Sequence, residues 1–228
     1  MDVSVIVATL DAARFLPAAL ASVRAQRDVS LDLIVVDAHS TDGTPEIARA
    51  FGARLVVQEG LGLAAAWNTG IAEARAPLIA FLDSDDQWVE NTMAERIQTV
   101  RSAPVPRMSV GRVRHFLEPG TAMPRSLDPG LFMTERLAPI PGTLIVPMKI
   151  FSEVGSFDPN YELAHDSDWI GRAIATGHHP DPVDRLVLLK RVHGGNRSLR
   201  ADENTRELLR TLRSKMAKSR LTPYGGAG

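Results

Sequence analysis

The chain has 228 residues, of which 44% are hydrophobic and 23% are charged, and its formal net charge is −1. This length is enough to bury a full core, and the near-neutral charge excludes a broad nucleic-acid-binding surface, so an anionic ligand has to be held by a local site. The absence of cysteine excludes disulfides, thiolate metal sites and cysteine nucleophiles.

No leader or membrane span is expected. The opening residues "MDVSVIVATLDAARF" lack a basic segment before their apolar run, and that run has the length of a strand. No window approaches the roughly 20 apolar residues that a membrane helix needs. Together with the absence of cysteine, this leads us to expect a soluble, cytoplasmic protein.

The first hundred residues alternate strand and helix signals. Apolar runs predict strands at 3–9, 31–37, 53–58 and 77–83, and helical patterns with turn or cap residues predict helices at 12–26, 40–52 and 61–76. Continuous apolar strands alternating with helices indicate a parallel sheet covered on both faces. Right-handed crossovers then place the carboxyl ends of the strands, and the ligand crevice, on one side.

Three polar turns would meet at that side of the sheet. They are "TLD" (9–11), "DAHSTDGT" (37–44) and "DSDD" (83–86). Each taken alone is explained by the polar turn residues that strand ends carry anyway. Their convergence is the first indication of one shared site.

The second half has a less regular pattern. We expect one or two strands in 106–120, a mobile loop at 121–130, a strand at 142–147, a short helix at 166–177 that ends at Gly177, a strand running into a polar loop at 184–198, and a terminal helix at 204–220. The narrow apolar stripe of that last helix is more typical of core or dimer packing than of membrane docking.

The acidic turn at 83–86 has two interpretations. Closely spaced aspartates at a strand end suit a hard divalent cation, which takes one or two carboxylates and leaves positions open for substrate phosphates. Alternatively, Asp85 or Asp86 caps a helix that starts near Trp88. Both can hold for different carboxylates.

Two further segments are candidates for chemistry. Asp166, in "ELAHDSDW", is a candidate general base if it lies across a cleft from the acidic turn, although a capping role explains it as well. His193, in "KRVHGGNRS", is followed by two glycines and flanked by basic residues, which leaves a phosphate or metal contact and a structural role equally open. No glycine-rich phosphate loop is present, so metal and basic side chains would have to hold a phosphate.

Taken together, these segments resemble a family 2 glycosyltransferase of the GT-A fold over roughly residues 3 to 198. The motifs that carry the resemblance are "VSVIVATLDAARFLPAALASVRAQ", "LDLIVVDAHSTDGTPEIA", "GLGLAAAWNTGIAEARAPLIAFLDSDDQW", "VGSFDPNYELAHDSDWIGRA" and "RVHGGNRS". The resemblance implies an α/β fold with a mostly parallel Rossmann-like sheet flanked by helices, a smaller acceptor-side sheet and a C-terminal helix. It also implies one catalytic domain at 1–200, with a nucleotide-sugar half (1–103) and an acceptor half (104–200), followed by a helix and flexible tail at 201–228.

The resemblance further implies a metal-dependent inverting transfer of a sugar, from a UDP-sugar in preference to other nucleotide sugars, to an acceptor hydroxyl. Asp166 takes the position of the base, and Asp85 and His193 those of contacts to Mg²⁺ or Mn²⁺. The positions that correspond to nucleotide-sugar binding are Thr9, Asp11, Asp37, Asn68, Asp83, Ser84, Arg191 and Arg197.

Several positions depart from the family pattern. Ala38 and His39 stand where the family has Asp and Gly, which weakens the inference of uridine, and Trp67 and His165 replace a usual Arg and Glu. Two alternatives therefore stay open: a sugar nucleotidyltransferase, and a non-catalytic relative that binds a nucleotide sugar. The acceptor class (saccharide, lipid-linked, peptide or small natural product) is not predicted, and a homodimer through the C-terminal helix is a further possibility.

Overall fold

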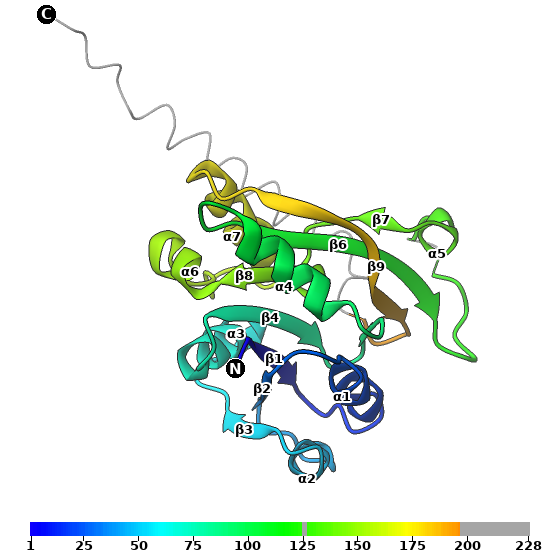
Figure 1. Ribbon diagram of the computed structural model, residues 1–228. Coiled ribbons are helices and arrows are strands. Elements are labelled where there is room, and N and C mark those ends of the chain that lie inside the picture. The colour runs from blue at the N-terminus through cyan, green and yellow to red at the C-terminus, as the bar shows by residue number, and fades with distance from the viewer. Residues whose placement is uncertain (125–126, 197–228) are drawn as a thin grey trace, which may run out of the picture.

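A computed structural model describes residues 1–124 and 127–196 and has an α/β fold (Figure 1). Its strands are β1 (Val3–Thr9), β2 (Leu31–Asp37), β3 (Arg54–Val57), β4 (Leu78–Asp83), β5 (Gln87–Trp88), β6 (Met108–Leu117), β7 (Arg136–Leu137), β8 (Leu144–Pro147) and β9 (Pro180–Val192). Its helices are α1 (Leu16–Arg24), α2 (Thr44–Ala50), α3 (Gly62–Glu73), α4 (Met93–Ser102), α5 (Gly130–Met133), the 3-10 helix η1 (Pro141–Thr143), α6 (Met148–Val154) and α7 (His165–Ala175).

The first half is a parallel sheet, as the sequence predicts, and its strand order is β3-β2-β1-β4. Alternate residues of the central strand β1 enter two different cores: Val5 packs into a core with α1, α2 and α4, whereas Ile6 packs into one with α3, α6 and α7. Because both faces are covered, the strands need apolar residues on both sides, which explains their nearly continuous apolar runs. The predicted fold class is confirmed.

The second half continues the same sheet. Within the described residues, nine strands form one hydrogen-bonded sheet, in which β4 is followed by β8, β6, β9 and β5, and β7 pairs with β6. The smaller acceptor-side sheet that we expected is therefore an extension of the main one. The junction is the antiparallel pairing of β4 with β8, in which Ile79 faces Val146.

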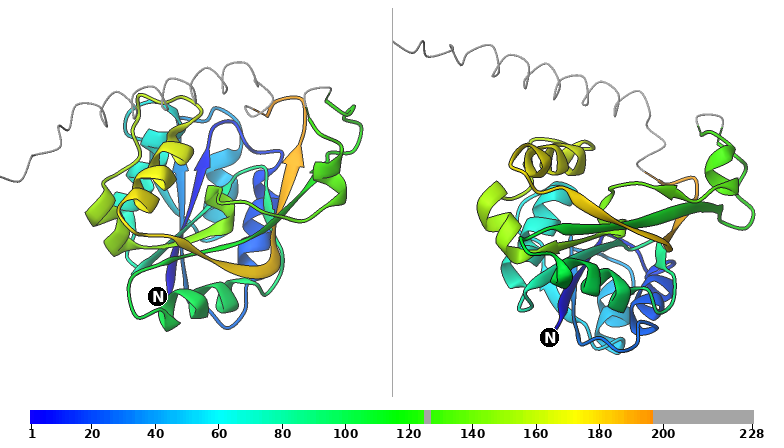
Figure 2. Two further views of the ribbon diagram at one scale, coloured as in Figure 1. Left: turned by 90° about the horizontal axis from the view of Figure 1, so that it is seen from above. Right: turned by 45° about the horizontal axis from the view of Figure 1, so that its top comes forward.

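Two long strands dominate this extension. β6 and β9 run side by side along most of their length, and their carboxyl-terminal parts curve towards the edge of the molecule where β7 and α5 project (Figures 1 and 2). Gly111 makes the close contact possible, because a Cβ atom at this position would lie 2.4 Å from Val187 Cγ2. This curvature carries the end of β9 over the carboxyl edge of the parallel strands.

The predicted elements of the first half agree with the observed ones within a few residues. Segment 106–120 is the single strand β6, and α7 is followed by Gly177 in a left-handed conformation (φ 91°) that ends the helix. The helix expected near Trp88 is wrong: Trp88 belongs to β5, and α4 begins at Met93. None of the described helices is long and apolar enough to cross a membrane. The C-terminal helix, its dimer role and Arg197 lie outside the described residues.

Candidate active site

The three polar turns meet at one edge of the sheet, as predicted. Thr9 at the end of β1 pairs in register with Asp37 at the end of β2, and its neighbour Ala8 pairs with Asp83 at the end of β4. In front of this edge is a cavity of about 760 Å³. Its wall includes seven of the predicted site residues, namely Thr9, Asp11, Asp83, Ser84, Asp85, Asp166 and His193.

Hydrogen bonds fix the first two turns to each other. The carboxylate of Asp37 accepts the hydroxyls of Thr9 (3.1 Å) and Ser40 (2.6 Å). The Asp11 amide donates to Ser40 Oγ (2.8 Å), and the Asp11 carboxylate accepts the Thr41 amide (2.8 Å). Asp37 is buried and is not part of the cavity wall. It therefore holds the turn that faces the cavity, whereas Thr9 and Asp11 are placed to face a ligand.

The third turn carries an acidic cluster suited to a cation. Carboxylate oxygens of Asp83, Asp85 and Asp86 lie within 4.8 Å of one another. Oxygen atoms at this spacing match the ligands that Mg²⁺ and Mn²⁺ prefer, so the residues present fit a divalent cation. Asp85 Oδ2 also lies 3.0 Å from His193 Nε2 and accepts the Asn196 side-chain amide at 3.0 Å.

Asp86 does not cap a helix, contrary to one interpretation of the sequence. Its side chain is 1% exposed and lies 3.0 Å from Lys190 Nζ, and it accepts the backbone amide of Arg191 (2.8 Å). Burial raises the pKa of Asp86 to about 7, although Lys190 acts in the opposite direction. Asp86 thus anchors β9 beside the acidic turn.

Lys190 also lines the cavity and lies 3.2 Å from Asp83. Burial alone would lower the pKa of Lys190, but the charges of Asp86, Asp83 and Asp85 outweigh that effect. The pKa of Lys190 is therefore raised, and its ammonium stays protonated at neutral pH.

Arg191 supports the acidic turn from behind. Its Nε donates to the carbonyl of Asp85 (2.8 Å), its guanidinium pairs with Glu118, and it lies over the rings of Phe15 (5.1 Å) and Phe116 (4.7 Å). Arg191 is buried and is not part of the cavity wall. The structure therefore places this predicted ligand-binding residue in a supporting position.

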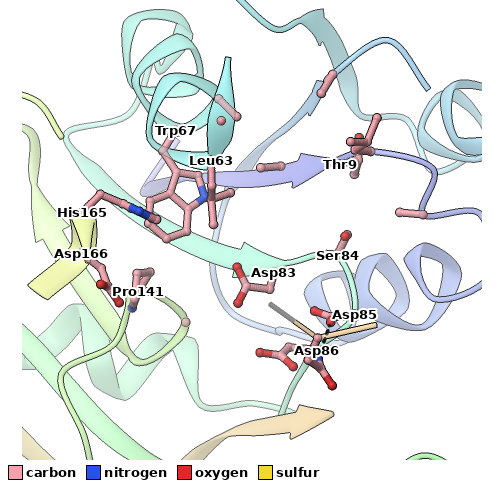
Figure 3. A pocket seen from close by; sticks show the side chains of 18 of the residues that line it. Thr9, Leu63, Trp67, Asp83, Ser84, Asp85, Asp86, Pro141, His165 and Asp166 are labelled. Atoms are coloured by element: carbon pink, nitrogen blue, oxygen red, sulfur yellow. Dashed lines mark hydrogen bonds between the residues drawn. The ribbon is translucent and has the colours of Figure 1, made fainter. Parts of the chain in front are cut away.

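The opposite end of the cavity is formed by α3 and the start of α7. Figure 3 shows Asp166, His165 and Trp67 on one side and the acidic turn on the other. The rings of Trp67 and His165 meet edge to face, with centroids 5.0 Å apart. Asp166 accepts the amide of Ser167 (2.6 Å), and among the described residues no basic side chain pairs with it. The cavity thus joins an acidic end to an end at which the Asp166 carboxylate has no basic partner among the described residues.

Asn68 is not in the cavity wall, although the sequence suggested a binding role. Its side-chain amide donates to the carbonyl of Phe157 (2.8 Å), and its side-chain oxygen accepts the amide of the same residue (3.0 Å). Asn68 therefore connects α3 to the segment before α7.

Among the cavity residues that were not predicted as site residues, four have polar or aromatic side chains beside the predicted ones: Trp67, His165, Lys190 and Asn196. The first two were recognised only as departures from a family pattern. Lys190 and Asn196 flank His193 in "KRVHGGNRS", and their contacts to residues 83–86 bridge more than a hundred positions of the chain. No local spacing could have indicated which carboxylates they meet.

A parallel α/β sheet whose carboxyl edge bears an acidic turn, opposite a carboxylate across one cavity, has the arrangement of a GT-A sugar transferase. Residues 4–154 match the model of glycosyl transferase family 2, and the chain belongs to this family. It is 30% identical over 164 residues to the glycosyltransferase AglE of Haloferax volcanii, with 64% of this chain and 52% of AglE covered. Its match to Bacillus subtilis EpsH, 35% identical over 100 residues, covers 42% of this chain and 29% of EpsH. The chain therefore spans about half or less of the length of these relatives.

A solved structure has the same fold. The mannosyltransferase PcManGT of Pyrobaculum calidifontis, in complex with GDP-Man and Mn²⁺, superimposes with a TM-score of 0.69 at 21% identity, covering 94% of this chain and 64% of that one.

Proposed function

We propose that this chain is a metal-dependent, inverting glycosyltransferase that moves a sugar, a hexose, from a nucleotide-sugar donor to an acceptor hydroxyl. The observation that carries the proposal is that one cavity holds both the acidic turn at Asp83–Asp86 and, at its other end, the carboxylate of Asp166, which has no basic partner among the described residues. Residues 1–103 would hold the donor, and residues 104–200 the acceptor.

Each of the seven predicted residues in the cavity wall has a role in this scheme. Thr9 and Asp11 would contact the nucleoside, Asp83 and Ser84 would face the donor ribose, and Asp85 with His193 would hold Mg²⁺ or Mn²⁺. When bound, the cation neutralises charge on the leaving diphosphate. Asp166 accepts the proton of the acceptor hydroxyl as that oxygen attacks the anomeric carbon. A base without a nucleophilic carboxylate partner implies a single displacement, and hence inversion at the sugar carbon.

Uridine remains the favoured base of the donor. Staphylococcus aureus TarS has been solved with UDP-GlcNAc and PcManGT with GDP-Man, so both nucleotides occur among structures with this fold. In this chain Ala38 has no polar group for the base, and the Asp37 carboxylate is already engaged by Thr9 and Ser40. Recognition of the base would therefore depend on Thr9, Asp11 and backbone groups.

The nucleotidyltransferase alternative has less support. Such an enzyme needs a basic loop after the first strand to hold a triphosphate, and Arg14 is the only basic residue there. Arg14 pairs with Glu118 (3.2 Å) and is not part of the cavity wall.

The test is a panel of UDP-, GDP- and other nucleotide sugars with Mn²⁺, scored by thermal shift and by donor hydrolysis, with and without a chelator. We expect one donor class to raise the melting temperature and to be hydrolysed, with hydrolysis lost on chelation. Absence of binding to every nucleotide sugar, together with no effect of the chelator, would refute the proposal. Preferential binding of a nucleoside triphosphate would favour a nucleotidyltransferase.

A substitution at Asp166 distinguishes an enzyme from a non-catalytic protein that only binds the donor. Asp166→Asn should abolish turnover while the donor still binds, because the amide cannot accept the proton. Asp184→Asn, on a carboxylate that is 84% exposed and outside the cavity, serves as the control. Full turnover by Asp166→Asn would show that the base is assigned wrongly, and a wild-type chain that binds donor without any turnover would be a non-catalytic relative.

A further inference from the structure

Lys190 occupies an unusual position in the acidic cluster. Its ammonium lies 3.0 Å from Asp86 and 3.2 Å from Asp83, on the side of the cluster that borders the cavity. Two of the three carboxylates that could ligate a metal are thus already paired with a cation that belongs to the chain.

The backbone holds Lys190 in this place. The Arg191 amide donates to Asp86 (2.8 Å), and Leu189 on the other side of Lys190 pairs with Gln87 across β5 and β9. Lys190 is therefore fixed between one contact to the acidic turn and one to β5, the strand that follows it. Its side chain is only 20% exposed, so solvent screens its charge weakly.

Asp85 differs from the other two carboxylates. Its partners are the ring of His193 and the amide of Asn196, and no ammonium or guanidinium pairs with its side chain among residues 1–124 and 127–196. A divalent cation that approaches the cluster meets the Lys190 charge on the side of Asp83 and Asp86, and meets an available carboxylate only at Asp85. One carboxylate is a weak site for Mg²⁺ or Mn²⁺, which usually completes its shell with substrate phosphates.

We propose that Lys190 acts as an internal cation that prevents a divalent metal from binding the acidic cluster until a nucleotide diphosphate is present. The inference rests on the proposed function of this site and adds an order of binding to it. The diphosphate supplies negative charge and oxygen ligands on the cavity side of Asp85. Asp85 would then hold the cation together with the diphosphate, while the ion pairs of Lys190 with Asp83 and Asp86 keep those two carboxylates occupied.

The experiment measures Mn²⁺ binding by the loss of the free-ion electron paramagnetic resonance signal, with and without uridine diphosphate. For the wild-type chain we expect weak binding of Mn²⁺ alone and binding at least tenfold tighter with the nucleotide. Lys190→Met removes the repulsion and frees the carboxylate of Asp83, which is 36% exposed. Mn²⁺ alone should then bind at least about thirtyfold more tightly. That factor corresponds to about 2 kcal/mol between a unit charge and a divalent ion about 4 Å apart under the full screening of water, and weaker screening would enlarge it.

Three further variants make the result specific. Lys190→Arg keeps the charge and should leave the binding of Mn²⁺ alone weak. Lys149→Met makes the same chemical change on α6, outside the cavity, and should have no effect. If Lys190→Met does not fold, as judged by circular dichroism, the double variant Asp86→Asn/Lys190→Met removes one buried charge of each sign and should also bind Mn²⁺ alone more tightly than the wild type.

The inference is overturned if the wild type binds Mn²⁺ equally well with and without nucleotide, or if neither Lys190→Met nor the double variant tightens binding of Mn²⁺ alone. Calorimetry with uridine and guanosine diphosphates and their sugars separates this result from the proposed function. A chain that binds none of them contradicts the proposed function, whereas a chain that binds one of them but shows no effect of Lys190 contradicts only the order of binding.

Discussion

Replacing Asn68 by alanine should destabilise the fold without weakening donor binding. The Asn68 side chain makes two hydrogen bonds, of 2.8 and 3.0 Å, to the backbone of Phe157, whose residue is 3% exposed. Each bond contributes about 1 kcal/mol net, and leaving a buried donor or acceptor unsatisfied costs about 1–3 kcal/mol. Because water can reach the Phe157 backbone only partly, we expect Asn68→Ala to lower the free energy of unfolding by about 3 kcal/mol.

Urea denaturation, followed by circular dichroism, measures this loss, and calorimetry with uridine diphosphate measures nucleotide affinity. The control is Asn160→Ala, because Asn160 has an exposed side chain whose bond is to Asp158, two residues away. We expect that variant to lose less than about 0.5 kcal/mol, as is usual for surface substitutions. A stable Asn68→Ala variant with greatly reduced nucleotide affinity would refute the structural role and restore Asn68 as a binding residue.

Two other substitutions probe the sheet. Gly70→Ala should destabilise the protein by up to about 2 kcal/mol in urea denaturation, because the new Cβ would lie 2.4 Å from Ile6 Cγ2. Overpacking costs about 1–3 kcal/mol, and the roughly 1 kcal/mol that alanine gains in a helix offsets part of it. An equal loss in Gly43→Ala, where nothing lies within 4 Å of the new Cβ, would contradict this. Burial would raise the pKa of Asp32, but hydrogen bonds from Arg54 and Ser4 lower it below its ordinary 3.8. The ionised Asp32 therefore stabilises the folded protein above pH 3.8, and this contribution is lost as the pH falls below that value. Denaturation across pH 3–7 should show that Asp32→Asn is less stable than the wild type at pH 7 and that the difference narrows in acid. A difference that does not change with pH would contradict the stabilising role of the Asp32 charge.

The parallel half of the fold could be predicted from the sequence because its signals are local. The strands β1, β2 and β4 are apolar over most of their length, with Ser4 and Asp32 as the exceptions, and the polar residues Thr9, Asp37 and Asp83 mark where each strand ends. Once a parallel sheet is inferred, these ends must meet at one edge, so the position of the site follows from chain order alone.

The parts that could not be predicted depend on contacts between distant segments. Asp86 has the sequence context of a helix cap, yet its partners are Lys190 and Arg191, more than a hundred residues away. Asn68 lies within a segment that suggests a ligand contact, but its position on α3 directs it to the Phe157 backbone. Sequence patterns indicate which residues are polar at a strand end; they do not indicate which of them face the cavity and which support it from behind.

The junction between β4 and β8 limits how this chain can be re-engineered. Residues 78–80 pair with 145–147, and the Met148 amide donates to the carbonyl of Pro77 (2.8 Å), so the two halves share backbone hydrogen bonds across the middle of one sheet. A chimera that takes its second half from another family member would have to reproduce this register, together with the Asp86 contacts to β9. Recombination at the linker after α4 would therefore break the sheet, and a change in what the cavity binds is better sought by replacing the loops at its rim.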